Sequence, residues 1–366
     1  MNLLGKTLKT LTTRRLDFTF DKMEFTIDRM TRKRLFNWLA AELTSAMKTP
    51  KAWAYPTHLQ IEPTSKCNLK CPLCNVVTDS RRPQGEMNLD RFKWIMDEIG
   101  EYLILIQLWG WGEPFMNRDI FPMIKYAKSK GIKVITSTNG HFLEKWQNLA
   151  ELLDSGLDYL IFALDGLDSK TYETYRAGGD FDRAVQGLRA LVNKKEQEKV
   201  SRPHINLRML VSRDNEGQID RMKTFARETG VDYFSLITMS PINSDRADWK
   251  KRLPHNPEYC RATFDADGEM IEKKNRCKRL WNHPFVYHNG DVYSCEYYTS
   301  REPPLGNVFE GGRARFGEIW FGESYDQLRK DFAGGKKSVK CACCPRCYAD
   351  AEQNVRHIFK PALFGR

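Results

Sequence analysis

The feature that most constrains this chain is a loop that holds three cysteines within eight residues. The sequence CNLKCPLC occupies residues 67–74 and follows a strand-like run over residues 58–63, so Cys67, Cys71 and Cys74 come just after a strand. A cubane iron–sulfur cluster takes four ligands, and three thiolates would leave one iron available for another group. Zinc is the alternative, although zinc loops usually bring a fourth Cys or His from close by, and residues 75–140 contain neither.

The other seven cysteines lie towards the C-terminus, and none occurs between Cys74 and Cys260. Tight C-x2-C and C-x3-C clusters without a recognisable signal peptide indicate metal ligands in a reducing cytosol rather than disulfides. No run of about 20 apolar residues is present that would predict a membrane-spanning helix. We therefore expect a cytoplasmic protein.

Residues 1–57 form a basic extension, with ten Lys or Arg against five Asp or Glu in the first 50 residues of a chain whose net charge is +11. Leucine spacing predicts a helix over residues 3–11, and a second helix is predicted from Thr31 with an apolar face of Leu35, Trp38, Leu39, Leu43 and Met47. Three basic residues, 32–34, lie in the first turn of that helix, where positive charge opposes the helix dipole. Because this placement is locally unfavourable, it suggests that the charge contacts a partner. Either these helices pack on the main domain or they dock peripherally on anionic lipid at a membrane surface.

From residue 58 to about 240, apolar and partly β-branched runs alternate with amphipathic helical stretches. Helices are predicted around residues 89–99, 121–127 and 181–191, and strands over residues 58–63, 103–109, 132–137, 159–164, 205–211 and 233–238. Six such alternations predict an α/β fold in which a parallel sheet curls into a partial (β/α)6 barrel. In barrels of this kind the catalytic residues lie at the carboxyl ends of the strands.

The ends of four successive predicted strands carry the residue types that a ligand site needs. The first strand leads into the cysteine loop, and the next three end in WGWGEP at residues 109–114, STNG at 137–140 and LDG at 164–166. Glycines let the backbone approach a ligand closely, and Ser, Asn, Asp and Glu offer hydrogen bonds to a ribose or an amino acid. Each turn is common by itself, but four at one edge of a sheet predict a binding site.

Residues 58–240 resemble the core of the radical S-adenosylmethionine enzymes, whose signature is C-x3-C-x2-C on a partial (β/α)6 barrel. The resemblance implies that Cys67, Cys71 and Cys74 hold a [4Fe–4S] cluster whose fourth iron binds the amino and carboxylate groups of S-adenosylmethionine. It also implies further cofactor contacts, namely Gly112 and Glu113 for the amino group, Ser137 and Asn139 for the ribose or carboxylate, Asp165 for the ribose, and Arg176 for the carboxylate. Trp111 stands where the family usually has the first glycine of its Gly-Gly-Glu segment.

The resemblance further implies a reaction class. The reduced cluster would cleave S-adenosylmethionine to a 5′-deoxyadenosyl radical, which removes a hydrogen atom from the substrate. The protein itself would bind and orient the reactants and exclude competing reactions. An external one-electron reductant of the flavodoxin or ferredoxin type would reduce the cluster. The sequence singles out no general base.

After residue 245 helical periodicity fades, and seven cysteines appear. Asn289-Gly290 between two β-rich runs predicts a hairpin that folds Cys295 back towards Cys277. With Gly290 to Cys295 as its G-x4-C element, this region resembles the SPASM or twitch auxiliary-cluster domain. The resemblance implies one auxiliary [4Fe–4S] cluster held by Cys277 and Cys295, with Cys341 and Cys344 or Cys344 and Cys347 as the remaining pair. Cys260 and Cys343 are expected not to be ligands, and a structural zinc ribbon is the alternative.

The sequence thus predicts three parts: a basic helical extension over residues 1–57, a radical S-adenosylmethionine core over 58–245 and an auxiliary-cluster domain over 246–366. A saturated auxiliary cluster suits electron transfer from a substrate radical, which favours oxidation of a hydroxyl-bearing small molecule. Ribosomal-peptide maturation is one alternative, although residues 1–57 lack the strand-rich pattern expected of a leader-binding module. The others are modification of a lipid head group at the membrane and, outside enzymes, a zinc-binding nucleic-acid adaptor, although no nucleic-acid partner is expected.

Overall fold

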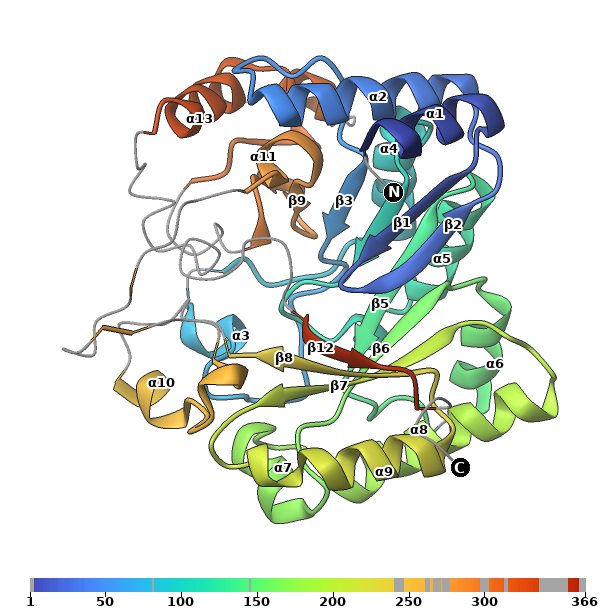
Figure 1. Cartoon of the computed structure of the whole chain (residues 1–366), viewed down its shortest axis with the longest axis vertical. Coiled ribbons are helices and arrows are strands. Elements are labelled where there is room, and N and C mark those ends of the chain that lie inside the picture. Colours follow the sequence, from blue (N-terminus) through green and yellow to red (C-terminus); the bar gives the residue numbers. More distant parts are fainter. Residues whose placement is uncertain are drawn as a thin grey trace.

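A curved ten-stranded sheet forms the centre of the computed structural model (Figure 1). The structure describes residues 3–80, 82–144, 146–239, 247–260, 264–265, 271, 277–296, 303–312, 315–335 and 355–361. The strand order is β11-β10-β9-β3-β4-β5-β6-β7-β8-β12. Its six central strands are parallel and consecutive: β3 (His58–Ile61), β4 (Leu105–Leu108), β5 (Lys133–Thr138), β6 (Tyr159–Ala163), β7 (His204–Val211) and β8 (Tyr233–Thr238). The predicted partial (β/α)6 barrel is confirmed, and every predicted strand is found.

Helices cover the outer face of this sheet. The predicted helices appear as α4 (Leu89–Ile99), α5 (Ile120–Ser129) and α8 (Phe181–Gln197), and the sequence interpretation missed α6 (Trp146–Asp154), α7 (Ser169–Tyr175) and α9 (Ile219–Thr229). Short helical turns are α3 (Asn75–Thr78), η1 (Pro114–Met116), η2 (Glu216–Gln218), α10 (Ala247–Arg252) and η4 (Pro257–Tyr259). Alternate strand residues such as Ile106, Val134 and Phe162 pack against the helices in one continuous apolar core. The other half of the strand residues therefore faces the lumen of the barrel.

The N-terminal extension contains a β-hairpin that the sequence interpretation missed. The predicted helices exist as α1 (Leu3–Thr13) and α2 (Arg32–Met47), but β1 (Leu16–Phe20) and β2 (Met23–Ile27) form an antiparallel pair between them. The extension is therefore helix–hairpin–helix rather than helical throughout. Met23 and Phe25 of the hairpin pack against the lumen residues Leu105, Ile135 and Tyr159. The hairpin thus occupies part of the lumen.

The hairpin's turn is held inside the barrel by a buried ion pair. Asp21 and Lys22 both have positive φ values, 48° and 62°, a conformation that non-glycine residues rarely adopt. The Arg208 guanidinium on β7 lies 3.1 Å from the Asp21 carboxylate and also donates to the Ser235 hydroxyl on β8. A turn with this geometry connects two-residue hairpins well because its twist matches that of the strands.

Helix α2 differs from its prediction in which residues it buries. Of the predicted apolar face, Leu35 and Trp38 are buried, whereas Leu43 and Met47 are exposed. Arg34 is also buried, and its guanidinium donates to the carbonyl oxygens of Gly100, Lys130 and Gly131. The Arg34 charge therefore stabilises the C-terminal ends of α4 and α5, where a cation is favourable, and does not contact an external partner.

The C-terminal region adds strands to both edges of the sheet. On one side β9 (Phe285–Val286) pairs parallel with β3, followed by β10 (Asp291–Tyr293) and β11 (Gly306–Asn307). On the other side β12 (Val355–Phe359) pairs antiparallel with β8. The predicted hairpin turn at Gly290, with φ of 95°, is confirmed. The accompanying helical elements are α11 (Arg279–Asn282), η6 (Glu310–Gly312), α12 (Phe316–Trp320) and α13 (Glu323–Ala333).

Within the described ranges, every helix is too short or too polar to cross a lipid bilayer.

Candidate cofactor and cluster site

The cysteine loop follows β3 at the carboxyl end of the barrel strands. The backbone N–H of Cys74 donates to the carbonyl of Cys71, and that of Lys70 donates to the carbonyl of Ala177, 2.8 Å away. None of the three cysteines is in a disulfide. Burial raises the pKa of the Cys67 thiol to about 12 and that of Cys74 to about 11, and it also raises the pKa of Cys71. Such thiols become thiolates when a cation is bound beside them, so this donor set fits a metal cluster.

A single zinc ion and a cubane cluster place different demands on the loop. Zinc needs its ligands about 2.0–2.3 Å from one ion, and among the residues that the structure describes no three Cys, His, Asp or Glu side chains form such a group. In a cubane each thiolate binds a different iron, so its ligands need not converge on one point.

Gly112, at the end of β4, lies directly against the cysteine loop. A Cβ atom at this position would lie 2.1 Å from the carbonyl oxygen of Thr64 and 2.8 Å from that of Lys66. The next residue, Glu113, donates its backbone N–H to the same Lys66 carbonyl over 2.8 Å. Only glycine permits this approach, and the contact positions the β4 end beside the loop.

Glu113 is a buried carboxylate at the centre of the strand ends. It accepts hydrogen bonds from the Thr138 hydroxyl at 2.9 Å, the Asn139 backbone N–H at 2.8 Å and the Phe115 N–H at 3.2 Å. Burial raises the pKa of the Glu113 carboxyl to about 7, although these donors act in the opposite direction. A carboxylate so placed would be stabilised by an incoming ammonium group. Thr138 was not among the predicted site residues.

Asn139 connects the end of β5 to the cysteine loop. Its side-chain Nδ2 donates to the Oδ1 of Asn68 over 2.8 Å, and its Oδ1 accepts from the backbone N–H of His141. Ser137 is two residues earlier on the strand and is partly exposed on the lumen side. Asn68 lies inside the C-x3-C spacing, where a pattern defined by cysteines alone does not reveal it.

Asp165, which is buried, and Arg176, which is half-buried, form an ion pair beside the loop. The Nε of Arg176 lies 2.6 Å from one oxygen of Asp165, whose other oxygen accepts from the backbone N–H of Leu210. Burial disfavours the charged guanidinium, but Asp165 and Cys71 raise the pKa of Arg176 well above its ordinary value. Arg176 in turn hydrogen-bonds the Cys71 thiol and acts to lower its pKa. The pair therefore places a fixed positive charge beside the loop.

A second buried ion pair joins the loop to the C-terminal region. Arg82 lies 2.6 Å from Glu62, and both side chains are almost fully buried. Glu62 also accepts from the backbone N–H of Trp111, and Arg82 donates its Nε to the Tyr287 hydroxyl over 3.3 Å. Nothing in the sequence pattern indicated this group of four residues, because Glu62, Arg82, Trp111 and Tyr287 lie on separate segments.

The auxiliary-cluster cysteines are only partly described. Cys295 is buried in an apolar cluster with Leu280, Trp281 and Tyr293, and Cys277 is half-buried. Neither is in a disulfide. The predicted ligands Cys341, Cys344 and Cys347, and the predicted non-ligand Cys343, lie outside the described residues.

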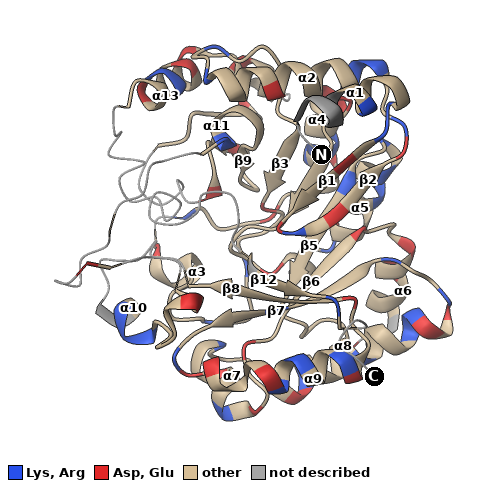
Figure 2. Cartoon of the chain, in the orientation of Figure 1, with Lys and Arg blue, Asp and Glu red and all other residues tan. Residues whose placement is uncertain are grey.

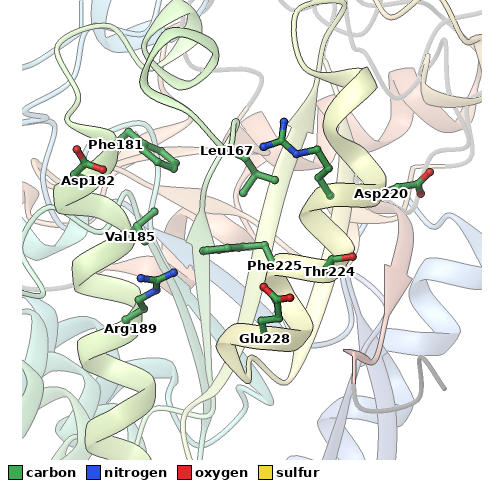
Figure 3. A pocket seen from close by; sticks show the side chains of 10 residues that line it. Leu167, Phe181, Asp182, Val185, Arg189, Asp220, Thr224, Phe225 and Glu228 are labelled. Atoms are coloured by element: carbon green, nitrogen blue, oxygen red, sulfur yellow. The ribbon is translucent and has the colours of Figure 1, made fainter. Parts of the chain in front are cut away.

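One cavity, of about 650 Å³, lies away from these strand ends, between α8 and α9 on the outer layer (Figure 3). Leu167, Val185 and Phe225 form its apolar floor, and Arg189 and Glu228 stand on its rim. None of the predicted site residues lines it.

Comparisons with known proteins match both regions of the chain. The family model of the radical SAM superfamily matches residues 61–226, and that of the SPASM iron-sulfur cluster-binding domain matches residues 277–348. An AdoMet-dependent heme synthase of Methanosarcina barkeri is 27% identical over 325 residues, covering 79% of this chain and 88% of the relative. A tungsten-containing aldehyde ferredoxin oxidoreductase cofactor-modifying protein of Pyrococcus furiosus is 26% identical, covering 74% of this chain and 83% of the relative.

Among solved structures, Streptococcus suis SuiB bound to the precursor peptide SuiA superposes with a TM-score of 0.58 at 16% identity. The superposition covers 93% of this chain and 80% of that one. At this level of identity the likeness shows a shared fold.

Proposed function

The chain is a radical S-adenosylmethionine enzyme with a C-terminal SPASM domain, and we propose that it oxidises a small hydroxyl-bearing molecule in the lumen of its partial barrel. When bound, the cluster and S-adenosylmethionine supply a 5′-deoxyadenosyl radical that removes a hydrogen atom from the substrate. We assign the three parts to residues 1–57, 58–245 and 246–366.

The residues at the strand ends would hold the cofactor. Glu113 would accept the methionine ammonium, since a buried carboxylate near neutrality gains from a cation. Arg176, fixed by Asp165, would face the methionine carboxylate, which suits a guanidinium fork. Ser137 and Asn139 would serve the ribose, and Gly112 would keep the backbone close to the cysteine loop.

The choice of substrate rests on one observation: the N-terminal hairpin fills part of the lumen. The N-terminal hairpin occupies the amino end of the lumen, with Met23 and Phe25 packed on Leu105, Ile135 and Tyr159 near the starts of β4 to β6. The space left for a substrate then lies towards the carboxyl ends of the strands. The wall between β3, β4 and the C-terminal region is polar: Gln60 donates to Glu296 over 2.7 Å, and Gln107 contacts His283. Amides and charged groups of this kind pair with hydroxyl groups.

The SPASM domain fits an oxidation. Cys277 and Cys295, with Cys344 and either Cys341 or Cys347, would hold one auxiliary [4Fe–4S] cluster. In the net reaction the substrate would lose a C–H hydrogen atom to 5′-deoxyadenosine, a hydroxyl proton to solvent and one electron, for which the cluster held by these cysteines would supply the acceptor. The product is a carbonyl compound, and the oxidation is a two-electron one. An external reductant of the flavodoxin or ferredoxin type would supply the first electron.

Peptide maturation is the main alternative. The hairpin weakens the argument made against it from sequence, because residues 16–27 do form two strands. These strands pack into the lumen, however, where their contacts are made with the barrel rather than with a peptide. Modification of a lipid head group is a further alternative, which requires the enzyme to reach a membrane.

Anaerobic reconstitution with iron and sulfide, followed by S-adenosylmethionine and dithionite, tests the proposal. We expect about eight irons per chain, since each cubane contributes four, and formation of 5′-deoxyadenosine. With polyols, aminocyclitols and short peptides deuterated at candidate carbons, deuterium should enter 5′-deoxyadenosine from the hydroxyl-bearing compounds, together with a carbonyl product. Deuterium transfer from peptides alone would overturn the substrate assignment. A content of about four irons per chain would account for one cubane only and would contradict the proposed auxiliary cluster.

A further inference from the structure

Helix α2 carries two apolar faces, and one of them is left exposed. Phe36, Leu43 and Met47 follow one another at i, i+7 and i+11, and their side chains are 65%, 55% and 61% exposed. At 100° per residue these three positions fall within about 40° of one another on the helix. Ala40 lies between them on the same line and is half-buried. They form a continuous stripe along the helix, which we call the α2 stripe (residues 36, 40, 43 and 47).

The exposure does not come from a loosely packed helix. On the opposite side of α2, Leu35, Trp38 and Ala41 are buried. The side chain of Asn37 donates to the carbonyl of Tyr55 and accepts from its N–H, at 3.1 Å and 2.9 Å. Together with the Arg34 contacts to α4 and α5, these bonds fix which face of the helix points outward.

Exposed apolar side chains gather in this part of the molecule. Of the eleven large hydrophobic residues that are exposed among those described, six lie between residues 8 and 53: Leu8, Leu11, Phe36, Leu43, Met47 and Trp53. The other five are spread over residues 77 to 321. Single exposed apolar residues are normal on a protein surface, whereas a cluster marks a surface that meets a protein or a membrane.

Positive charge surrounds the stripe. Residues 1–50 hold ten basic and five acidic residues, a surplus of five out of the net +11 of the whole chain. Arg32 precedes the stripe, and Lys48 and Lys51 follow it; none of the three forms an ion pair among the described residues, and the Lys48 ammonium lies 5.7 Å from the centre of the Phe332 ring. Figure 2 shows basic residues on this edge of the molecule, together with an acidic position on α2, Glu42.

This charge pattern distinguishes two candidate partners of the α2 stripe, a second copy of the chain and an anionic lipid surface. If two copies paired through α2 in antiparallel fashion, Arg32 of one would face Lys48 and Lys51 of the other, and parallel pairing would oppose identical charges. An apolar stripe with cations at both ends is instead complementary to an anionic phospholipid surface, where apolar side chains enter the interface and cations meet the head groups. We propose that α2 docks this enzyme peripherally on anionic membranes through the α2 stripe, with Arg32, Lys48 and Lys51 contacting lipid phosphates.

Vesicle sedimentation of the full-length, cluster-loaded protein tests the proposal. We expect the protein to bind vesicles of mixed phosphatidylglycerol and phosphatidylcholine, and to bind pure phosphatidylcholine much more weakly. The triple variant Phe36→Ser, Leu43→Ser, Met47→Ser should lower the partition coefficient by about tenfold or more, because three apolar side chains no longer enter the interface. Val200→Ser, an exposed apolar residue distant in sequence, is the matched control and should bind as the wild type does.

A second variant, Arg32→Glu with Lys51→Glu, keeps the stripe and reverses the flanking charge. It should lose most of the preference for anionic vesicles, and the preference of the wild type should weaken as salt is added. The proposal is overturned if the wild type does not partition, if the triple variant partitions unchanged, or if neutral vesicles bind equally well. A dimer that the triple variant converts to monomer would assign the stripe to a second copy instead. These outcomes do not depend on the substrate proposed above.

Discussion

The two cysteine sets of this enzyme are built in opposite ways. The first set lies within eight residues of one loop and comprises Cys67, Cys71 and Cys74. Backbone hydrogen bonds connect this loop and the residue before it to the 176–179 segment and to the end of β4. Cys277 and Cys295 lie eighteen positions apart with the β9–β10 hairpin between them, and Cys295 is buried in an apolar cluster with Leu280 and Trp281. Local spacing can prepare the first set, whereas the second depends on the tertiary fold.

The sharpest test of this comparison is to remove one cysteine from each set. Cys71→Ala should abolish formation of 5′-deoxyadenosine, since two thiolates do not hold the cluster that binds the cofactor. Cys295→Ala should still produce 5′-deoxyadenosine but should not complete turnover of the substrate. The measurements are iron per chain and 5′-deoxyadenosine under dithionite. Equal losses of cofactor cleavage in both variants would show that the two sets do not have separate tasks.

Arg82 tests whether the two regions are coupled. Replacing Arg82 by Met leaves the Glu62 carboxylate buried without its cation, and we expect a loss of about 3–5 kcal/mol in the free energy of unfolding. Lys125→Met, which breaks the exposed Lys125–Asp154 pair, is the control and should change stability little. Chemical denaturation of the two variants gives the comparison. If both regions unfolded at separate denaturant concentrations in the wild type, the coupling would be absent.

Gly112 tests the local construction of the first set. Gly112→Ala would bring a Cβ to within 2.1 Å of the Thr64 carbonyl, so the backbone must shift. We expect a loss of about 1–3 kcal/mol in stability and lower iron content at the first cluster. Gly217→Ala is the control, because nothing lies within 4 Å of the added methyl group. An iron content that Gly112→Ala leaves unchanged would show that the loop does not need this contact.

The smallest expected effect is a pH dependence of cofactor binding through Glu113. Because the pKa of this carboxyl is about 7, it is neutral at lower pH and cannot pair with the methionine ammonium. Affinity for S-adenosylmethionine should therefore fall as the pH drops below 7, by up to about tenfold per unit. Glu113→Gln should bind weakly at every pH and lose this dependence. Calorimetric titration of the cluster-loaded enzyme between pH 5.5 and 8 measures both, and the same slope in the variant would assign the titration elsewhere.

Much of the core was predictable because its signals are local. Buried parallel strands appear as short apolar runs, and all six were found from such runs. Two of the three helices that were missed differ in this respect: α7 has only seven residues, and α9 carries seven charged or polar side chains among its eleven positions. The hairpin at residues 16–27 was missed because its turn is Asp21-Lys22 rather than the Asn-Gly that usually marks such turns.

Other features followed from contacts between distant segments. From the sequence, the charge of Arg34 was interpreted as one that contacts a partner. In the structure its guanidinium instead donates to carbonyl oxygens at the C-terminal ends of α4 and α5. Leu43 and Met47 were placed on one apolar face with Leu35 and Trp38, but they are exposed in the structure because Arg34 and Asn37 fix the other side of the helix. A periodic pattern identifies apolar positions on a helix, and it cannot tell which of two apolar faces the neighbours cover.

The sequence by itself determined the chemistry class and the fold. Three cysteines at C-x3-C-x2-C spacing, followed by six strand–helix alternations, indicated a radical S-adenosylmethionine core, since both signals act over a few residues. Only the tertiary structure decided that Glu62 and Arg82 join the two regions, that a hairpin fills part of the lumen, and that α2 exposes Phe36, Leu43 and Met47. Those outcomes depend on packing between residues up to two hundred positions apart, for example Arg82 and Tyr287, and no local pattern encodes such a pairing.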